Sequence, residues 1–257
     1  MKQLIIFLVL LLPALFWAQK EGEITFEETT KLEIQLPEGL PISKAQLEKM
    51  MPSETKQLYT LLFNNEASVY QVITNEPNEE QANQMGEDGS AIQVKMIRAI
   101  NENITYHDIK NKSTTMQQGF MGKTFLIQDE AKKYAWKLSN ESKEIAGYTC
   151  QKATLEEEDR KVEAWFTTAI PIASGPSNFY GLPGVILGLH IKGENSERWL
   201  TATEVELKKL EKDALIAPTK GKKVNRDQYN KIVEEKMKEM EEQAGGGGTV
   251  IRVRRQE

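Results

Sequence analysis

The chain has 257 residues, with 33 Lys and Arg against 38 Asp and Glu, which gives a formal net charge of −5. An acidic chain without a basic cluster is a poor binder of nucleic acid, so we expect no nucleic-acid partner. Cys150 is the single cysteine, which excludes a disulfide within the chain and leaves open a free thiol or a bond between two chains.

The N-terminus has the order of parts found in a secretory signal peptide. Lys2 supplies a positive charge, an apolar run extends from Leu4 to Trp17, and the small residue Ala18 follows. The run is shorter than the roughly 20 apolar residues that a membrane-spanning helix needs. We therefore predict a signal peptide over residues 1–18, a periplasmic or secreted, outer-envelope location, and no transmembrane span after its removal.

The residues that follow predict a strand, a helix and a hairpin. KLEIQLP, residues 31–37, alternates apolar and polar side chains, as in a strand with one face in water. Residues 43–51 have helical spacing and end at a proline. Residues 57–74 predict a hairpin with its turn at 64–66, and the polar residues 75–90 predict a loop.

Residues 92–207 predict a meander of short strands separated by polar turns. The expected strands are KTFLIQ, KYAWKLS, GYTCQKATL, RKVEAWFTT, GVILGLHIKG and RWLTATEVEL. Residues 211–257 form a distinct C-terminal extension, with an amphipathic helix over 227–243, a flexible GGGG and a possible edge strand over 249–255. The fold class is therefore mainly β (α+β), a large curved antiparallel meander or open barrel with a few helices.

Candidates for chemistry are few. His107 and His190 are the whole supply of histidine, and neither lies in a nucleophile, metalloprotease or CxxC motif. Thioethers favour Cu(I), and Met116 and Met121 lie close together in the sequence. We predict no catalytic residue, no metal ligand and no cofactor, and keep a copper-handling protein and a hydrolase using a histidine as alternatives.

The stretch FYGLPGVILGLH, residues 179–190, predicts a strand that is covered on both faces and is preceded by a rigid turn. The expected faces are Val185, Leu187, Leu189 and Ile191 on one side and Gly184, Ile186, Gly188 and His190 on the other. Glycines on one face let a neighbour approach closely, and a proline between two glycines sets the chain direction. We predict a structural motif at Gly181, Leu182, Pro183 and Gly184, and tentative ligand or partner contacts at Phe179, Tyr180, Gly188 and His190.

These residues resemble the GLPGLI family, secreted proteins widespread in Bacteroidota. The resemblance rests on GPSNFYGLPGVILGL at 175–189, KEIAGYTCQKA at 143–153, VEAWFTTAIP at 162–171 and the hairpin LLFNNEASVY. Val185 stands where the name motif has leucine. The resemblance implies export and a single GLPGLI-like domain over residues 19–257. It implies no enzyme activity, because the family has no established catalytic residues to carry over.

The function expected from the sequence is therefore a non-catalytic periplasmic or outer-envelope protein. We expect it to bind a lipid, a peptide or a partner protein, such as another outer-envelope protein, on a curved β-sheet. A small apolar ligand is included in this expectation because envelope carriers of the lipoprotein-chaperone type also use a curved antiparallel sheet. That likeness is one of fold alone.

Overall fold

The computed structural model describes residues 21–33, 53–73, 103–157 and 160–244. Within these residues twelve strands form one sheet, in the order β12-β6-β5-β4-β3-β2-β1-β11-β10-β9-β8-β7. β12 and β7 are its two ends, so the described sheet is open and does not close into a barrel. Every described pair is antiparallel except β12 with β6. The prediction of a mainly β, antiparallel fold with a C-terminal helix is confirmed.

The elements have the following bounds. They are β1 (Gly22–Leu32), β2 (Glu54–Phe63), β3 (Ala67–Val72), β4 (Ile104–Asp108), β5 (Ser113–Phe120), β6 (Lys123–Glu130), β7 (Lys137–Ile145), β8 (Tyr148–Glu156), β9 (Arg160–Thr167), β10 (Val185–Gly193), β11 (Ser196–Glu206), β12 (Lys222–Val224) and α2 (Arg226–Ala244). The predicted helix over 43–51, the loop over 75–90, the GGGG and the C-terminal edge strand lie outside the described residues. So does the predicted signal peptide.

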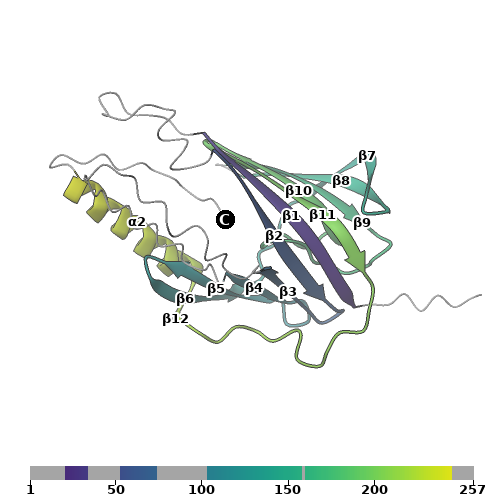
Figure 1. Ribbon diagram of the computed structural model, residues 1–257, viewed down its shortest axis with the longest axis horizontal. Coiled ribbons are helices and arrows are strands. Elements are labelled where there is room, and N and C mark those ends of the chain that lie inside the picture. The colour runs from purple at the N-terminus through teal and green to yellow at the C-terminus, as the bar shows by residue number, and fades with distance from the viewer. Residues whose placement is uncertain (1–20, 34–52, 74–102, 158–159, 245–257) are drawn as a thin grey trace, which may run out of the picture.

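The sheet bends between two groups of strands. In Figure 1, β1, β2 and β11 run steeply across the picture with β8–β10 fanned out beside them, while β3–β6 lie at a large angle to β1 and β2. α2 lies beside β5 and β6, and its Tyr229 packs against Phe125 and Phe120 at ring-centroid distances of 5.4 and 6.4 Å. The bend gives the sheet an inner face, which holds most of the core, and an outer face.

The predicted hairpin is confirmed, and its turn has a clear local cause. β2 and β3 pair in antiparallel register, and the side chain of Asn64 accepts hydrogen bonds from the backbone N–H groups of Glu66 and Ala67, both at 2.8 Å. An asparagine side chain that bonds backbone groups two and three residues ahead stabilises a tight turn. The C-terminal helix begins in a similar way, since Asn225 and Gln228 exchange side-chain-to-backbone bonds of 2.9 and 3.0 Å.

One strand prediction needs correction, and another lies largely outside the described residues. Lys31 and Leu32 of the predicted strand KLEIQLP are the last two residues of β1, and residues 34–37 are outside the described residues. Tyr134 and Trp136, predicted on a strand, lie instead in an irregular connection before β7. There the Tyr134 hydroxyl donates to the Asn178 carbonyl at 3.0 Å, and the Trp136 indole N–H donates to the Tyr180 carbonyl at 2.9 Å. Both side chains are therefore committed to holding another segment rather than to pairing in a sheet.

That segment, residues 168–184, covers the inner face of the sheet and supplies much of its core. Its apolar side chains are almost fully buried with those of the strands: Ile170, Ile172, Phe179 and Leu182. It reaches across the bend, because the hydroxyls of Ser174 and Ser68 of β3 lie 2.7 Å apart and the Tyr180 ring stacks on His107 of β4 at 3.9 Å. We call residues 168–184 the inner segment.

β10 returns from the inner segment into the middle of the sheet and contains a bulge. Ile186 pairs with Phe166 and Gly188 pairs with Trp165, so one extra residue lies between them. The predicted division of faces holds from Gly188 onward, but the bulge turns Ile186 to the inner face. On the outer face, a Cβ at Gly188 would lie 2.9 Å from the side chain of Ile145, which belongs to the end of β7.

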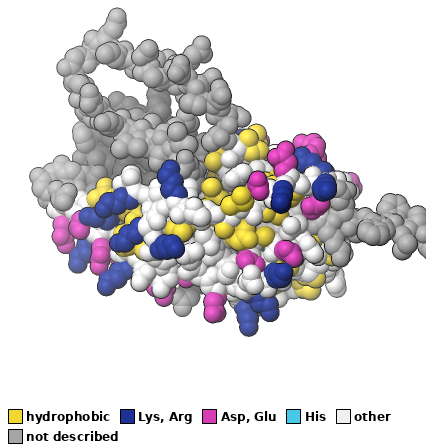
Figure 2. All heavy atoms as spheres, turned by 90° about the horizontal axis from the view of Figure 1, so that it is seen from below, with side chains coloured by type: hydrophobic (Ala, Val, Ile, Leu, Met, Phe, Trp, Pro, Cys, Tyr) yellow, Lys and Arg dark blue, Asp and Glu magenta, His cyan; other side chains and the backbone are white. Residues whose placement is uncertain are grey.

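The surface has no dominant charge on the face that Figure 2 shows. Basic and acidic side chains are intermixed there, with hydrophobic side chains gathered between them. Nucleic-acid binding needs basic side chains collected on one face. Among the described residues, no helix is both long enough and apolar enough to cross a bilayer.

Gly184 provides a direct test of the entry into β10. A Cβ there would lie 2.0 Å from the backbone carbonyl oxygen of Thr167, which cannot move aside as a flexible side chain can. We expect Gly184→Ala to lower the free energy of unfolding by about 2–4 kcal/mol in urea denaturation. Gly119→Ala is the matched control, because a Cβ at Gly119 meets nothing within 4 Å, and its change should stay below about 1 kcal/mol. Equal effects of the two substitutions would contradict the proposed clash.

Candidate functional site

The four predicted contact residues divide between the two faces of the sheet. Phe179 is fully buried in the core and Tyr180 stacks on His107, so both belong to the inner segment and the inner face. Gly188 and His190 lie on the outer face. There the His190 ring nitrogen Nε2 lies 2.7 Å from Oε1 of Glu197, and the ring stacks on Trp199 at 5.1 Å. The structure therefore does not bring the four residues together.

The GLPG residues set the direction in which the backbone enters β10. Gly181 has a φ of +89°, in the region that favours glycine, and Leu182 is buried in the core. Pro183 is exposed, and Gly184 passes against the Thr167 backbone. In this arrangement the motif turns the chain from the inner segment into β10.

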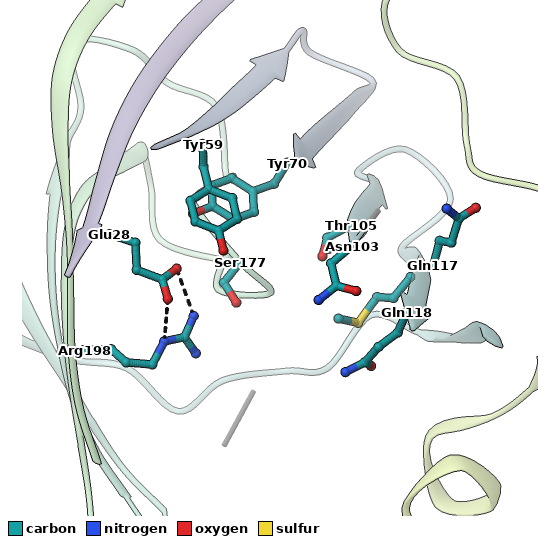
Figure 3. Close-up of a pocket in the computed structure, with 10 residues that line it drawn as sticks. Glu28, Tyr59, Tyr70, Asn103, Thr105, Gln117, Gln118, Ser177 and Arg198 are labelled. Atoms are coloured by element: carbon teal, nitrogen blue, oxygen red, sulfur yellow. Dashed lines mark hydrogen bonds and ion pairs between the residues drawn. The ribbon is translucent and has the colours of Figure 1, made fainter. Parts of the chain in front are cut away.

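A pocket opens on the inner face, lined from β1, β2 and β11 on one side of the bend and from β3, β4 and β5 on the other (Figure 3). The cavity has a volume of about 60 Å³. Its wall comes from six strands, from Asn103 just before β4, and from the inner segment: Glu28, Tyr59, Tyr70, Asn103, Thr105, Met116, Gln117, Gln118, Ser177 and Arg198. Most of these side chains carry a hydroxyl, a carboxamide or a charge, which distinguishes the pocket from the apolar core beside it.

Glu28 and Arg198 form a buried, two-pronged ion pair in this wall. The Nε and Nη2 atoms of Arg198 each donate to one carboxylate oxygen of Glu28 at 3.1 Å, as Figure 3 shows. The side chains are only 11% and 4% exposed. Thr30 donates a further hydrogen bond to Glu28 at 3.1 Å. Burial opposes the charge of Arg198, but Glu28 outweighs burial and raises the pKa of Arg198, so the guanidinium stays charged.

Tyr70 brings a buried hydroxyl to the same wall. Its ring stacks on Tyr59 with a centroid distance of 4.9 Å and meets Phe26 edge-on at 6.1 Å. The hydroxyl oxygen has no hydrogen-bond partner among the described residues. Burial, and then the negative charge of Glu28, raise the pKa of Tyr70 well above its ordinary value, so the group keeps its proton. The hydroxyl is therefore a buried, protonated group that no described residue hydrogen-bonds.

Local sequence explains how the strands present these groups. Alternate residues of β1 face inward, so Ile24 and Phe26 enter the apolar core and Glu28 and Thr30 follow on the same face. Ser177 reaches the pocket from the inner segment with a φ of +59°, a conformation that residues other than glycine seldom adopt. Strained backbone of this kind is often found at binding sites.

The sequence reasoning missed this pocket. Glu28 and Arg198 are 170 residues apart, and no motif joins them. A signal was present on each strand, since Glu28 continues the alternation of Ile24 and Phe26, and Arg198 that of Leu200 and Ala202. A charged residue that the alternation along a strand places on the buried face predicts a partner of opposite charge, but it does not identify that partner.

The methionines and the cysteine considered from the sequence lie apart from one another. Met116 faces the pocket and accepts a contact from Arg226, while Met121 lies in the exposed turn between β5 and β6. No three His, Cys, Asp or Glu side chains gather as a metal site in the described part of the chain. Cys150 is buried, and burial raises the pKa of its thiol to about 11, so the thiol is protonated at neutral pH.

Comparison with known proteins gives one family match to a short part of the sequence and two solved structures with a similar fold. A family model described as "Protein of unknown function (Porph_ging)" and named for Porphyromonas gingivalis matches residues 155–188, which include the whole inner segment. No curated protein matches significantly. A solved structure of PNGF-II is similar over 83% of this chain and 33% of that one, with 14% identity and a TM-score of 0.51. A second crystal form gives 15% identity and a TM-score of 0.49. These likenesses concern the fold alone, and this chain spans about a third of PNGF-II.

The Glu28–Arg198 pair predicts an unequal response to single and double substitution. Glu28→Gln leaves a buried guanidinium without its counter-charge, and we expect the free energy of unfolding to fall by about 3–5 kcal/mol. The double variant Glu28→Leu with Arg198→Leu removes both charges and should lose less than the single variant. The exposed pair Glu27–Lys56, at 2.9 Å, is the control, and Glu27→Gln should cost below about 1 kcal/mol. Additive losses in the double variant would contradict a coupled buried pair.

His107 predicts a loss of stability in mild acid. Burial against Tyr180 lowers its pKa from 6.5 to about 4, so the unfolded chain takes up a proton at higher pH than the folded protein does. Stability that is present above pH 6.5 is therefore lost as the pH falls towards 4, by on the order of 3 kcal/mol. Urea denaturation between pH 7 and pH 4.5 measures the loss. His107→Gln should remove most of it and His190→Gln should not, whereas equal slopes in all three proteins would exclude His107 as the cause.

Proposed function

We propose that this protein is an exported, non-catalytic binding protein of the cell envelope, and that its binding surface is the inner face of the bent sheet. The observation that carries the proposal is the pocket on that face, whose wall holds the buried Glu28–Arg198 ion pair. Taking two charges out of water is costly, so an ion pair buried beside a cavity suits contact with a ligand better than stabilisation of the fold. The signal-like sequence of residues 1–18 supports export.

Membership of the GLPGLI family is part of the same proposal. Its support is the motif itself and the match of an uncharacterised family model to residues 155–188, which span the motif. The inner segment that carries the motif also lines the pocket through Ser177. A family signature in the segment that forms the inner layer is consistent with a binding surface that is common to the family.

The geometry supports binding over acid–base chemistry. Each oxygen of Glu28 accepts from Arg198, and Thr30 adds a third bond, so both carboxylate oxygens are already engaged. A general base must lie within hydrogen-bond reach of the proton that it takes from a substrate, and these bonds occupy the oxygens that would do so. The pair instead provides a fixed polar wall.

A peptide or a partner protein fits the pocket better than a lipid does. An acyl chain needs a long apolar cavity, whereas this one has a volume of about 60 Å³ and nine of its ten lining side chains carry a hydroxyl, a carboxamide or a charge. One side chain of a larger ligand suits that volume, with the rest of the ligand outside. We therefore propose a peptide or protein segment that inserts one side chain.

Native mass spectrometry of protein purified from its own cell envelope tests the proposal. We expect a mature mass beginning near Gln19 and an additional bound mass. Thr105→Leu places a larger apolar side chain in the pocket and should remove the bound mass. Thr115→Leu makes the same change on the adjacent strand β5, on the outer face, and should keep it.

The opposite results are equally definite. An N-terminus that retains residues 1–18 would exclude the proposed export. A wild-type protein that carries no bound mass and crosslinks to no envelope protein would exclude a binding role. A bound mass that Thr105→Leu keeps and Thr115→Leu removes would move the binding site to the outer face.

A further inference from the structure

We propose that two contacts across the bend form an acid-sensitive clasp, which holds the inner segment against β3 and β4 at neutral pH and releases it in mild acid. The clasp consists of Ser174 on Ser68 and of Tyr180 on His107. Ser177 lies between the two contacts in the inner segment and lines the pocket (Figure 3), so opening of the clasp changes the pocket wall. The effect on a bound ligand rests on the proposed function, whereas the opening itself does not.

The two contacts of the clasp are made at one place on the sheet. Ser68 of β3 and His107 of β4 lie opposite each other in the antiparallel pairing of these strands. The hydroxyls of Ser174 and Ser68 lie 2.7 Å apart, and the Tyr180 ring stacks on the His107 ring with a centroid distance of 3.9 Å and an angle of 24° between the planes. A change of charge on His107 therefore acts where both contacts are made.

His107 is poorly placed to carry a positive charge. The residue is only 7% exposed, and its ring nitrogen Nδ1 has no hydrogen-bond partner among the described residues. In an imidazolium both ring nitrogens are donors, so Nδ1 would carry a buried N–H group without an acceptor. The face of the Tyr180 ring attracts a cation, but it replaces neither the lost hydration nor the missing acceptor. The geometry alone thus favours a neutral imidazole.

The neighbouring strands offer no close counter-charge within the part of the chain that the structure describes. Ser68 on β3 and Thr114 on β5, which lie opposite His107, are uncharged. Asp129 of β6 lies opposite Thr114, and its carboxylate accepts a hydrogen bond from the backbone N–H of Arg226 in α2 at 3.1 Å. Asp129 is two strands away from His107, which corresponds to roughly 10 Å, so its attraction for a charge there is weak.

Two titratable groups are closer to His107. Tyr180 faces it from the inner segment, and burial raises the pKa of the Tyr180 hydroxyl, so that group is uncharged. Asp108 follows His107 on β4 and accepts two hydrogen bonds of 2.8 Å from Asn111. The negative charge of Asp108 favours a charged His107, but burial has the larger effect and lowers the pKa of His107 from 6.5 to about 4.

Tyr180 is held from its other side, which directs the response to protonation. Trp136 donates to the Tyr180 carbonyl at 2.9 Å, and the backbone of Lys132 hydrogen-bonds the Tyr180 hydroxyl. An unfavourable charge on His107 is therefore relieved when the segment and the strand move apart. Ser177 favours the same change, because its φ of +59° is strained and is maintained while both contacts of the clasp fix the chain around it.

The direction and size of the pH effect follow from the two states of His107. In the open clasp the ring is in water with its ordinary pKa of 6.5, whereas in the closed clasp its pKa is about 4. The preference for the closed form is complete above pH 6.5 and is lost progressively as the pH falls towards 4. Between pH 7.5 and pH 5.0 the equilibrium constant for opening should rise by about 25-fold.

Hydrogen exchange measured by mass spectrometry at pH 7.5 and pH 5.0 tests the clasp without a ligand. After correction for the intrinsic pH dependence of exchange, the amides of residues 174–180 should exchange about 10- to 25-fold faster at pH 5.0. The amides of β8 and β9 should change by less than about threefold, which separates local opening from unfolding. A rise below about threefold at residues 174–180, or an equal rise in β8 and β9, would overturn the proposal.

Three variants assign the response. His107→Gln removes the titrating group, so exchange at residues 174–180 should be the same at both pH values. His190→Gln removes the histidine of the outer face and should behave as the wild type. Ser174→Ala removes the hydroxyl contact and keeps His107, so exchange should be faster than in the wild type at both pH values and should keep its pH dependence. A pH effect that persists in His107→Gln would contradict the assignment to His107.

A direct titration covers the case in which His107→Gln does not fold. The chain has two histidines, so the imidazole proton signals in the NMR spectrum are assigned with His190→Gln alone. The signal of His107 should titrate with a midpoint well below 6.5. A midpoint at or above 6.5 would mean that the closed clasp tolerates the charge, and the proposal would be wrong.

Failure of the clasp can be told from failure of the proposed function. The exchange experiment contains no ligand, so a negative result removes the clasp and leaves the binding role standing. The mass bound to protein from its native envelope should be kept at pH 7.5 and lost at pH 5.0, and His107→Gln should keep it at both. A mass that the wild type keeps at pH 5.0 would exclude control of the pocket by the clasp. If no mass is bound at either pH, the proposed function falls and the exchange result alone decides the clasp.

Discussion

The inner face of the bent sheet must be covered, and residues 168–184 cover it. All described strands belong to one sheet, so no second sheet packs against that face. The segment supplies the missing layer through buried Ile170, Ile172, Phe179 and Leu182, and it is anchored on the far side of the bend by Ser174 on Ser68 and Tyr180 on His107. Tyr134 and Trp136 hold its carbonyl groups from the other side. A sheet of this kind depends on one long connection more than on any pair of strands.

The same arrangement explains why the inner face has a dry part and a polar part. Along β1, Ile24 and Phe26 belong to the apolar core, whereas Glu28 and Thr30 lie further along the same face. There only Ser177 of the inner segment reaches the wall, and the groups that remain are polar. A buried ion pair is seldom favourable for stability compared with a well-packed apolar pair, so its presence suits a recognition role better than a structural one.

The sequence predicts well what is decided locally. The hairpin at Asn64, the helix begun by Asn225 and the two-faced strand after Pro183 all follow from turn chemistry or periodicity within a few residues. β1 was missed because Glu28 and Thr30 interrupt the apolar alternation on its buried face, and Arg198, the ion-pair partner of Glu28, lies 170 residues away in the sequence. The placement of Tyr134 and Trp136 was wrong because their hydrogen bonds go to carbonyl groups 44 residues away. The pocket depends wholly on such distant pairings, and periodicity contains no information about them.

The place of β1 in the sheet has a consequence for the order in which the protein acquires its structure. Glu23, near the start of the described chain, pairs with Glu206, so β1 has its partner β11 only after most of the polypeptide has been made. Contacts between such distant residues slow folding and leave strand edges open in the meantime. Until β11 arrives, β1 and β2 form at most an edge hairpin, whose buried-face Ile24, Phe26 and Leu61 would be open to water. A nascent chain would thus expose the residues that later form its core, and its tendency to aggregate would be greatest before β11 has been made.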